Sequence, residues 1–484
     1  AVDPARIHDL HMVQSGIVLP EHLDVFELGI ARRLDCSYMG PQSARVARML
    51  FGGKIELGAV HTYLELFARY FIDLTPKVAL IAAVSADREG NLYTGPNTED
   101  TPTIVEATAF KDGIVVAQVN EVVERVPRVD IPGDRVHFVV ASDKPFFVEP
   151  LFTRDPGAIT ETQILTAMLA IKGIYEPYGV KRLNHGIGFN TAAIELLLPT
   201  YGERLGLKGK IASHWALNPH PTLIPAIESG WVSQVHCFGS EVGMDAYIRA
   251  RPDIFFTGPD GGLRSNRAIC QTAGHYACDM FIGSTLQIDL AGHSSTVTTS
   301  RIAGFGGAPN MGADARGRRH ASSSWLQAGA EADPETSGPM RRGRKLVVQI
   351  GETFGAGNVP MFVEKLDALV LAEKLGLDLA PVMVYADDIS HIVTEEGIAN
   401  LLLCRDKDER EQAIRGVAGY TEIGRGRDRK MVERLRERRA IIRPEDLGID
   451  PLDADRNLLA ARSIKDLVRW SGGLYAPPAQ FRNW

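Results

Sequence analysis

Residues 78–93 read VALIAAVSADREGNLY, an apolar run of strand type that ends in a D-x-x-G-N turn from Asp87 to Asn91. Residues 280–293, MFIGSTLQIDLAGH, follow the same plan and end in a D-x-x-G-H turn from Asp289 to His293. Apolar runs bounded by glycine turns are typical of the buried strands of α/β proteins. The repetition predicts two copies of one structural plan.

The apolar run that follows each turn matches as well, with VVAQVNE from Val115 and VVQIGE from Val347. Each turn and the run after it are separated by 28 residues in the first copy and by 58 in the second, which contains GFGGAPN (304–310). We therefore predict an α/β fold of two related domains with mainly parallel sheets. The predicted domains are 1–155 and 156–484, joined by a hinge at 150–156, and the second carries an inserted glycine and arginine loop near 304–345.

Composition excludes several classes of protein. The 484 residues are 45% hydrophobic and 23% charged, as in globular proteins, and the net charge of −7 argues against a nucleic-acid partner. The longest apolar runs are too short to cross a bilayer, so no membrane association is expected. The five cysteines form no CxxC pair, which favours reduced thiols and a cytoplasmic location.

The stretch GFGGAPN raises the question of which ligand its backbone approaches. A dinucleotide fingerprint requires a third glycine opening a helix, but Pro309 stands there and a polar loop follows. A plain surface turn is one alternative. The other is a site for an oxyanion, in which Gly306 and Gly307 bring backbone N–H groups close to the ligand.

Two further stretches carry candidate residues. NHGIGFN (184–190) precedes the apolar helix TAAIELLL and is either a strand-to-helix turn or an anion site, or both. Residues 214–247 contain three histidines, but their spacing lacks an H-x-x-x-H pair, so we expect no metal site. Glu241 follows the strand-like VSQVHCFGS, where α/β folds present ligand-binding groups, although a solvated glutamate is the plainer interpretation. Cys237 in that run is expected to be buried and structural.

The inserted loop is basic, with DARGRRH at 314–320 and PMRRGRK at 339–345. It is either a solvated loop or a docking surface for an acidic or phosphorylated partner, and arginine suits phosphate. The docking hypothesis assigns that role to Arg316, Arg318 and Arg319.

Several long motifs resemble one family. TLQIDLAGHSS, GFGGAPN and IVTEEGIANL (392–401) are similar to motifs of the acetyl-CoA hydrolase/transferase family. Five longer motifs resemble the alpha subunits of bacterial malonate decarboxylases, and the similarity extends over the whole chain. These motifs are ADREGNLYTGPNTEDTP, LNHGIGFNTAAIELLLPTYGE, LNPHPTLIPAIESGW, GFGGAPNMGADARGRRH and WSGGLYAPPAQFRNW. Members of that family carry further residues upstream, including a glycine-bearing segment, and we expect full activity to depend on them.

This resemblance implies two CoA-transferase-like domains and an acyl-carrier-protein transferase that exchanges acetate for malonate on a carrier thioester. The implied partners are the acyl carrier protein and the decarboxylase subunits. The carrier holds a phosphoribosyl-dephospho-CoA group, and this chain itself is expected to bind no cofactor and no metal. The candidate catalytic residues are Glu241, Gly306 and Gly307. The candidate substrate-binding residues are Gly186, Gly188, Asn190, Asn218, His220 and Asn310.

Two mechanisms stay open at this point: Glu241 attacks the thioester and forms a covalent intermediate, or malonate attacks directly. Two other functions also stay open. One is a CoA transferase or hydrolase that acts on free acyl-CoA, and the other is a non-catalytic scaffold that positions the carrier protein.

Overall fold

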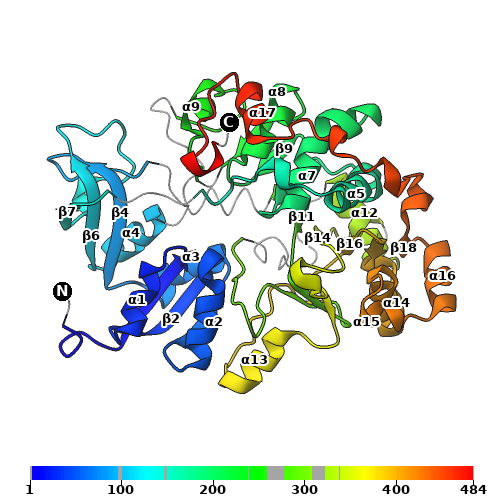
Figure 1. The fold of residues 1–484 in the computed structure, drawn as a ribbon, viewed down its shortest axis with the longest axis horizontal. Coiled ribbons are helices and arrows are strands. Elements are labelled where there is room, and N and C mark those ends of the chain that lie inside the picture. Colours follow the sequence, from blue (N-terminus) through cyan, green and yellow to red (C-terminus); the bar gives the residue numbers. More distant parts are fainter. Residues whose placement is uncertain are drawn as a thin grey trace. The chain divides into compact units, whose positions relative to one another are not determined.

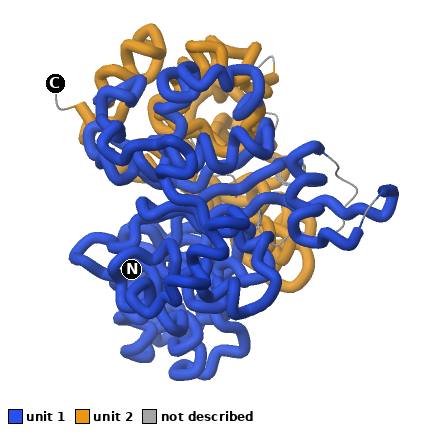
Figure 2. The backbone as a smooth tube through the Cα atoms, turned by 90° about the vertical axis from the view of Figure 1, so that its right-hand side faces the viewer, with its two compact units in different colours: residues 1–62, 154–213, 277–463 blue, residues 63–153, 214–276, 464–484 orange. Residues whose placement is uncertain are grey.

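The structure, a computed structural model, describes residues 3–95, 101–145, 150–237, 239–258, 277–307, 322–336 and 338–482. The chain forms two compact units, coloured in Figure 2: the first comprises residues 1–62, 154–213 and 277–463, and the second comprises residues 63–153, 214–276 and 464–484. One boundary, between Thr153 and Arg154, falls inside the stretch predicted as a hinge. The division into related domains at 155/156 describes two copies of one plan and stays a prediction.

The first unit contains a sheet whose strands follow the order β8-β11-β14-β16-β17-β18 (Figure 1). The bounds are β8 Arg182–His185, β11 Met280–Gly283, β14 Leu346–Ile350, β16 His391–Thr394, β17 Gly397–Asn400 and β18 Ile441–Ile442. The first four run parallel, and β17 and β18 are antiparallel to their neighbours. Every residue of β11, β14 and β16 is buried, which explains why their sequences are mainly apolar.

Helices accompany this sheet along the chain: α5 Glu161–Ala170, the π-helical turn η4 Ile171–Tyr175, α6 Glu176–Tyr178, α7 Phe189–Leu197, α12 Ser323–Ala332, α14 Lys407–Val417, α15 Glu422–Arg425 and α16 Arg429–Glu437. The helix α5 begins with a capping box formed by Thr160 and Gln163. It continues through η4 into α6, so one uninterrupted helical segment spans Glu161–Tyr178.

Two small sheets complete the first unit. One has the parallel order β1-β2-β3, with β1 Leu10–Gly16, β2 Ala31–Tyr38 and β3 Glu56–Val60, and the helices α1 Glu21–Glu27 and α2 Ser43–Phe51 lie between them in the chain. The other has the order β13-β12-β15, with β12 Gln287–Asp289, β13 Ser294–Ser295 and β15 Phe362–Val363, followed by α13 Asp367–Leu375. Leu34, Val297 and Leu371 belong to one apolar core, which joins these parts of the unit.

The second unit contains a sheet of order β5-β4-β6-β7, with β4 Val78–Ala86, β5 Leu92–Tyr93, β6 Ile114–Val122 and β7 Phe138–Ala141. Strands β4, β6 and β7 are parallel, in agreement with the predicted mainly parallel sheets. Alternate residues of β4 are buried, and α4 packs against β4 and β6 (Figure 1). The unit also contains α3 Tyr63–Ile72, α4 Thr101–Phe110, α8 Ile224–Glu228, α9 Asp245–Ala250, α17 Ile464–Trp470 and the parallel pair β9 His214–Ala216 and β10 Gln234–His236.

The repeated D-x-x-G turns have the same geometry. Asp87 N–H donates to the carbonyl of Asn91, and its Oδ1 accepts the N–H groups of Glu89 and Asn91, each at 3.0 Å. Asp289 N–H donates to the carbonyl of His293 at 3.0 Å, and its Oδ1 accepts from Ala291 and His293 at 3.1 and 2.9 Å. The glycine of each turn has a positive φ, +82° for Gly90 and +94° for Gly292, which explains why glycine stands there.

The strand register extends this correspondence. In the first copy Ala79 pairs with Val115, and in the second Phe281 pairs with Val347. Ala79 and Phe281 occupy the same position relative to the aspartate of their own turn. The second copy differs in one respect, because the chain leaves the large sheet after Gly283 and β12 pairs with β15 instead. The predicted equivalence of the two turns and of the strands beside them is therefore confirmed, with a break in the second copy.

The fold is α/β with mainly parallel sheets, as predicted. No helix among the described residues is long and apolar enough to span a membrane. Four cysteines in the described part of the chain, Cys36, Cys237, Cys278 and Cys404, form no disulfide there, and Cys270 lies outside it. Burial raises the pKa of the Cys237 thiol, as expected for a structural cysteine.

Candidate functional site

The carboxyl ends of β8, β11, β14 and β16 lie at one edge of the central sheet of the first unit, because these strands are parallel. We call this the carboxyl edge. In α/β folds ligands bind at this edge. Three predicted substrate-binding residues, Gly186, Gly188 and Asn190, directly follow β8 and are brought together here.

The glycines of this turn allow it to approach the neighbouring strand. Gly186 N–H donates to Ile282 at 2.8 Å, and a Cβ on Gly186 would lie 3.0 Å from the Cα of Gly283. A Cβ on Gly188 would lie 3.2 Å from the Ser284 hydroxyl. The predicted strand-to-helix turn is thus confirmed, and close packing accounts for both glycines.

Asn190 lies in the first turn of α7 and is 8% exposed. Its side-chain oxygen accepts the hydroxyl of Thr166, on α5, at 3.0 Å. This contact fixes the amide at the carboxyl edge, where its NH₂ group is a hydrogen-bond donor suited to a carboxylate or carbonyl oxygen.

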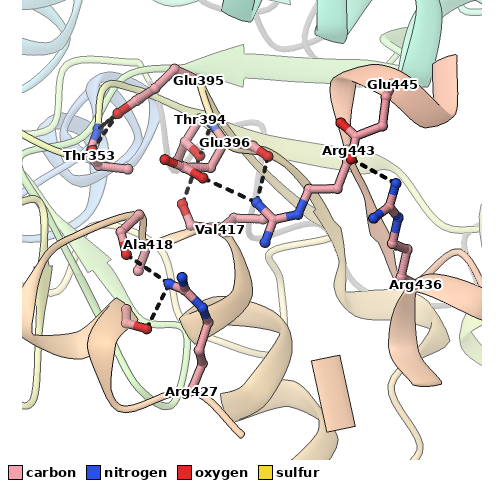
Figure 3. A network of polar contacts seen from close by, with 12 residues as sticks. Thr353, Thr394, Glu395, Glu396, Val417, Ala418, Arg427, Arg436, Arg443 and Glu445 are labelled. Carbon is pink, nitrogen blue, oxygen red and sulfur yellow. Dashed lines mark hydrogen bonds and ion pairs between the residues drawn. The ribbon is translucent and has the colours of Figure 1, made fainter. Parts of the chain in front are cut away.

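Sequence reasoning missed two carboxylates at the same edge. After β16, Glu395 accepts the backbone N–H of Thr353 at 3.0 Å and also its hydroxyl (Figure 3). After β14, Glu352 accepts the side-chain amide of Gln163 at 2.9 Å. Both glutamates directly follow buried strand sequences, VVQIGE and IVTE, and that position could have marked them.

Glu396, the next residue of the VTEEG motif (393–397), is bound by a different segment of the chain. Arg443 donates to the backbone carbonyl of Glu396 at 2.8 Å and to its carboxylate at 3.3 Å, as Figure 3 shows. The two glutamates of the motif therefore tie β16 to two different segments, the loop after β14 and the segment after β18. This motif holds the carboxyl edge together.

The glycine loop begins at Gly304, which has φ +82° and forms a bridge with Tyr38. A Cβ at Gly304 would lie 2.3 Å from the carbonyl oxygen of Ser37, so only glycine fits. That carbonyl accepts the N–H of Phe305 at 2.7 Å and the N–H of Gly306 at 3.1 Å. The N–H of Gly306, predicted as an oxyanion donor, thus has a protein acceptor in this structure.

Glu241 lies in the second unit and is only 2% exposed. Its Oε1 accepts the N–H of Thr153 at 3.0 Å and the Thr153 hydroxyl at 2.7 Å, and its Oε2 accepts the N–H of Phe152 at 3.3 Å. Burial raises the pKa of the Glu241 carboxyl, and these hydrogen bonds oppose the rise. The interpretation of Glu241 as a solvated glutamate is wrong, because the carboxylate is buried and bound on both oxygens.

Asn218 and His220 are also buried in the second unit, at 5% and 6% exposure. The His220 ring stacks on Phe152, with 5.9 Å between centroids, and its electrostatic attraction is a minor effect that opposes the burial that raises the pKa of Glu241. His220 is therefore close to the Glu241 network. Within the described ranges, no group of three or more His, Cys, Asp or Glu side chains is arranged to hold a metal ion.

The remaining candidates are Asn310, Arg316, Arg318 and Arg319, which lie outside the described residues. Gly307 is the last described residue before them. The roles assigned to all these residues stay predictions.

Comparison with known proteins identifies the family to which this chain belongs. The family described as "Malonate decarboxylase, alpha subunit, transporter" matches residues 1–484. The chain is 65% identical over 484 residues to the "Acetyl-S-ACP:malonate ACP transferase" of Malonomonas rubra, covering 100% of this chain and 87% of the relative. The chain belongs to the family of malonate decarboxylase alpha subunits, as its motifs predicted.

Solved structures agree with this assignment. A Pseudomonas malonate decarboxylase hetero-tetramer in complex with malonate contains a chain that is 60% identical, with a TM-score of 0.95, covering 100% of this chain and 88% of that one. The malonate decarboxylase alpha subunit of Acinetobacter baumannii is 57% identical, with a TM-score of 0.93, covering 99% of this chain and 88% of that one.

Proposed function

We propose that this chain is an acyl-carrier-protein transferase that exchanges acetate for malonate on a carrier-protein thioester. The observation that carries the proposal is the 65% identity, over every residue of the chain, to an acetyl-S-ACP:malonate ACP transferase. The partners would be an acyl carrier protein bearing a phosphoribosyl-dephospho-CoA group and the decarboxylase subunits. The Pseudomonas relative is part of a hetero-tetramer that was solved in complex with malonate. This supports a multi-subunit assembly and malonate as the substrate.

The chemistry proposed is a balanced exchange of acyl groups. A carboxylate oxygen of malonate attacks the acetyl carbonyl, and the carrier thiolate leaves, which forms a mixed acetyl–malonyl anhydride. The thiolate then attacks the malonyl carbonyl and releases acetate. Each attack passes through a tetrahedral oxyanion, which fixed hydrogen-bond donors stabilise.

The described residues supply candidates for these roles. Asn190 provides a side-chain donor at the carboxyl edge, beside the Gly186–Gly188 turn, and Gly306 and Gly307 provide backbone N–H groups in the glycine loop. The Gly306 donor serves an oxyanion only when its bond to Ser37 opens. Both oxygens of Glu241 already accept hydrogen bonds, and this favours direct attack by malonate over a covalent route through Glu241.

The test is transfer of labelled malonate onto acetylated carrier protein by this chain. Label on the carrier, with release of one acetate for each malonyl group, supports the proposal. Rapid turnover of free acetyl-CoA without the carrier protein would assign the chain to the CoA transferases or hydrolases. Binding of the carrier protein with no transfer would leave a positioning scaffold.

A further inference from the structure

Next to the Gly186–Gly188 turn, three buried polar side chains are linked by hydrogen bonds. Tyr175 of η4, His185 of β8 and Glu195 of α7 are fully or almost fully buried. The Tyr175 hydroxyl lies 2.6 Å from His185 Nε2, and His185 Nδ1 lies 2.9 Å from Glu195 Oε1. The imidazole is therefore bound at both nitrogens, by groups from two other elements.

The direction of these hydrogen bonds follows from the chemistry of the groups. Burial, together with the negative charge of Glu195, raises the pKa of Tyr175 far above its ordinary value, so the hydroxyl keeps its proton. When His185 is neutral, the hydroxyl donates to Nε2 and the ring proton stands on Nδ1, facing the carboxylate. An imidazole bound in this way has one tautomer and one orientation.

The position of His185 connects this chain to the proposed site. His185 is the last residue of β8, and Gly186 follows it directly. Thr191, one turn before Glu195 on α7, donates its hydroxyl to the carbonyls of Gly186 and Gly188 at 2.6 and 3.0 Å. The turn is thus held from α7 by Thr191 and from below by the bond between His185 and Glu195.

We propose that His185 is a positioning residue for malonate transfer, which holds the Gly186–Gly188 turn and Asn190 in register through Tyr175 and Glu195. This inference rests on the proposed function. Removing one of the bonds shifts the turn while the glycines and Asn190 remain. The effect is on the geometry of bound malonate, and a displacement of about 1 Å at a reacting group lowers a rate by about 10²-fold.

The same unit contains a matched control at the opposite edge of the sheet. His391, the first residue of β16, is buried, and its Nε2 lies 3.2 Å from the Tyr178 hydroxyl. That hydroxyl also bonds Glu331 and Asn400. Since β8 and β16 lie in one parallel arrangement, His185 ends its strand at the carboxyl edge and His391 begins its strand at the amino edge.

The experiment compares Tyr175→Phe and His185→Gln with the control pair Tyr178→Phe and His391→Gln, all in the full chain. Denaturant unfolding measures the stability of each variant, and labelled-malonate transfer is measured for the folded protein. We expect Tyr175→Phe and His185→Gln to lower kcat/KM for malonate by about 10- to 100-fold, with little change in KM for the acetylated carrier. We expect the control variants to lose stability but to keep kcat/KM for malonate within about threefold of the wild type. That change corresponds to less than about 1 kcal/mol of activation free energy.

Equal losses of transfer in the two pairs would show that the Tyr175–His185–Glu195 chain has only a structural role, and would overturn the inference. Tyr175→Phe removes a single oxygen atom, so it gives an answer where His185→Gln does not fold. Absence of malonate transfer by the wild type is a separate outcome, because it refutes the proposed function before any variant is compared.

Discussion

Thr153 and Glu241 are 88 residues apart in the chain, yet the Glu241 carboxylate accepts both the backbone N–H and the hydroxyl of Thr153, at 3.0 and 2.7 Å. The Thr153 hydroxyl lies in turn 3.3 Å from the hydroxyl of Tyr475. Glu241 and Thr153 together therefore join three distant segments of the second unit. A carboxylate used in this way is an anchor, and nucleophilic attack would require these bonds to break.

The first prediction separates an anchor from a nucleophile. We expect Glu241→Ala to lower the free energy of unfolding by about 1–3 kcal/mol for each buried donor left without an acceptor. We also expect it to lower the rate of transfer by about 10²-fold, because the segments that Glu241 anchors are displaced. Glu241→Gln keeps an acceptor for Thr153, so it should retain transfer within about tenfold. Unfolding curves and labelled-malonate transfer check both variants.

Borohydride trapping provides the control for that prediction. An anchor forms no enzyme thioester, so borohydride during turnover should leave wild-type activity intact. Inactivation of the wild type together with complete loss of transfer in Glu241→Gln would show that Glu241 is the nucleophile.

The second prediction concerns Gly304. Its φ is positive, and a Cβ added there would lie only 2.3 Å from the Ser37 oxygen, so we expect Gly304→Ala to destabilise the protein by about 2–5 kcal/mol. Gly376→Ala is the matched control, since Gly376 also has a positive φ of +63° but a Cβ there meets no atom within 4 Å. We expect the control to cost about 1–2 kcal/mol in urea unfolding, from the backbone conformation alone. Equal losses would contradict the close approach to Ser37.

The third prediction uses the two matched turns. Burial opposes ionisation of Asp87, but hydrogen bonds from Asn91 and other residues hold the pKa of Asp87 below its ordinary value. Burial raises the pKa of Asp289 above its ordinary value, and the backbone hydrogen bonds in its turn, together with the attraction of His293, offset only part of this rise. Ionised Asp87 therefore stabilises the fold above its unfolded pKa of about 3.9, and this contribution is lost as the pH falls through its folded pKa. The contribution of Asp289 has the opposite sign, since it is present at low pH and lost as the pH rises through the raised pKa.

The measurement is the free energy of unfolding of Asp87→Asn and Asp289→Asn from about pH 3 to pH 6, around the ordinary aspartate pKa. The loss caused by Asp87→Asn, relative to the wild type, should grow with pH. The loss caused by Asp289→Asn should shrink with pH. Parallel curves for the two variants would refute the assigned directions.

The fourth prediction concerns the basic loop. Replacing Arg316, Arg318 and Arg319 by glutamate should raise KM for the carrier protein and remove most of its salt dependence, because clustered charges speed association with an acidic partner and salt screens them. KM for malonate serves as the internal control and should not change. An unchanged KM and salt profile for the carrier would identify the loop as solvated surface.

The sequence predicted those features that depend on neighbouring residues. The apolar runs located β4 and β6, and the D-x-x-G spacing located two turns whose hydrogen bonds match. It did not predict the partners of Glu395 and Glu241, because Thr353 lies 42 residues and Thr153 lies 88 residues away in the chain. The acceptor of the Gly306 N–H, Ser37, comes from another sheet altogether, and no local pattern specifies such a pairing.

The contact between Gly243 and Ala476 has a consequence for biosynthesis. Ala476 N–H donates to the Gly243 carbonyl at 3.0 Å, and a Cβ at Gly243 would lie 1.9 Å from the Ala476 oxygen, so the two backbones touch. The second unit, which contains Glu241, takes its last segment from residues 464–484. Because this segment follows the whole of the first unit in the chain, the contact between Gly243 and Ala476 can form only after the first unit has been synthesised.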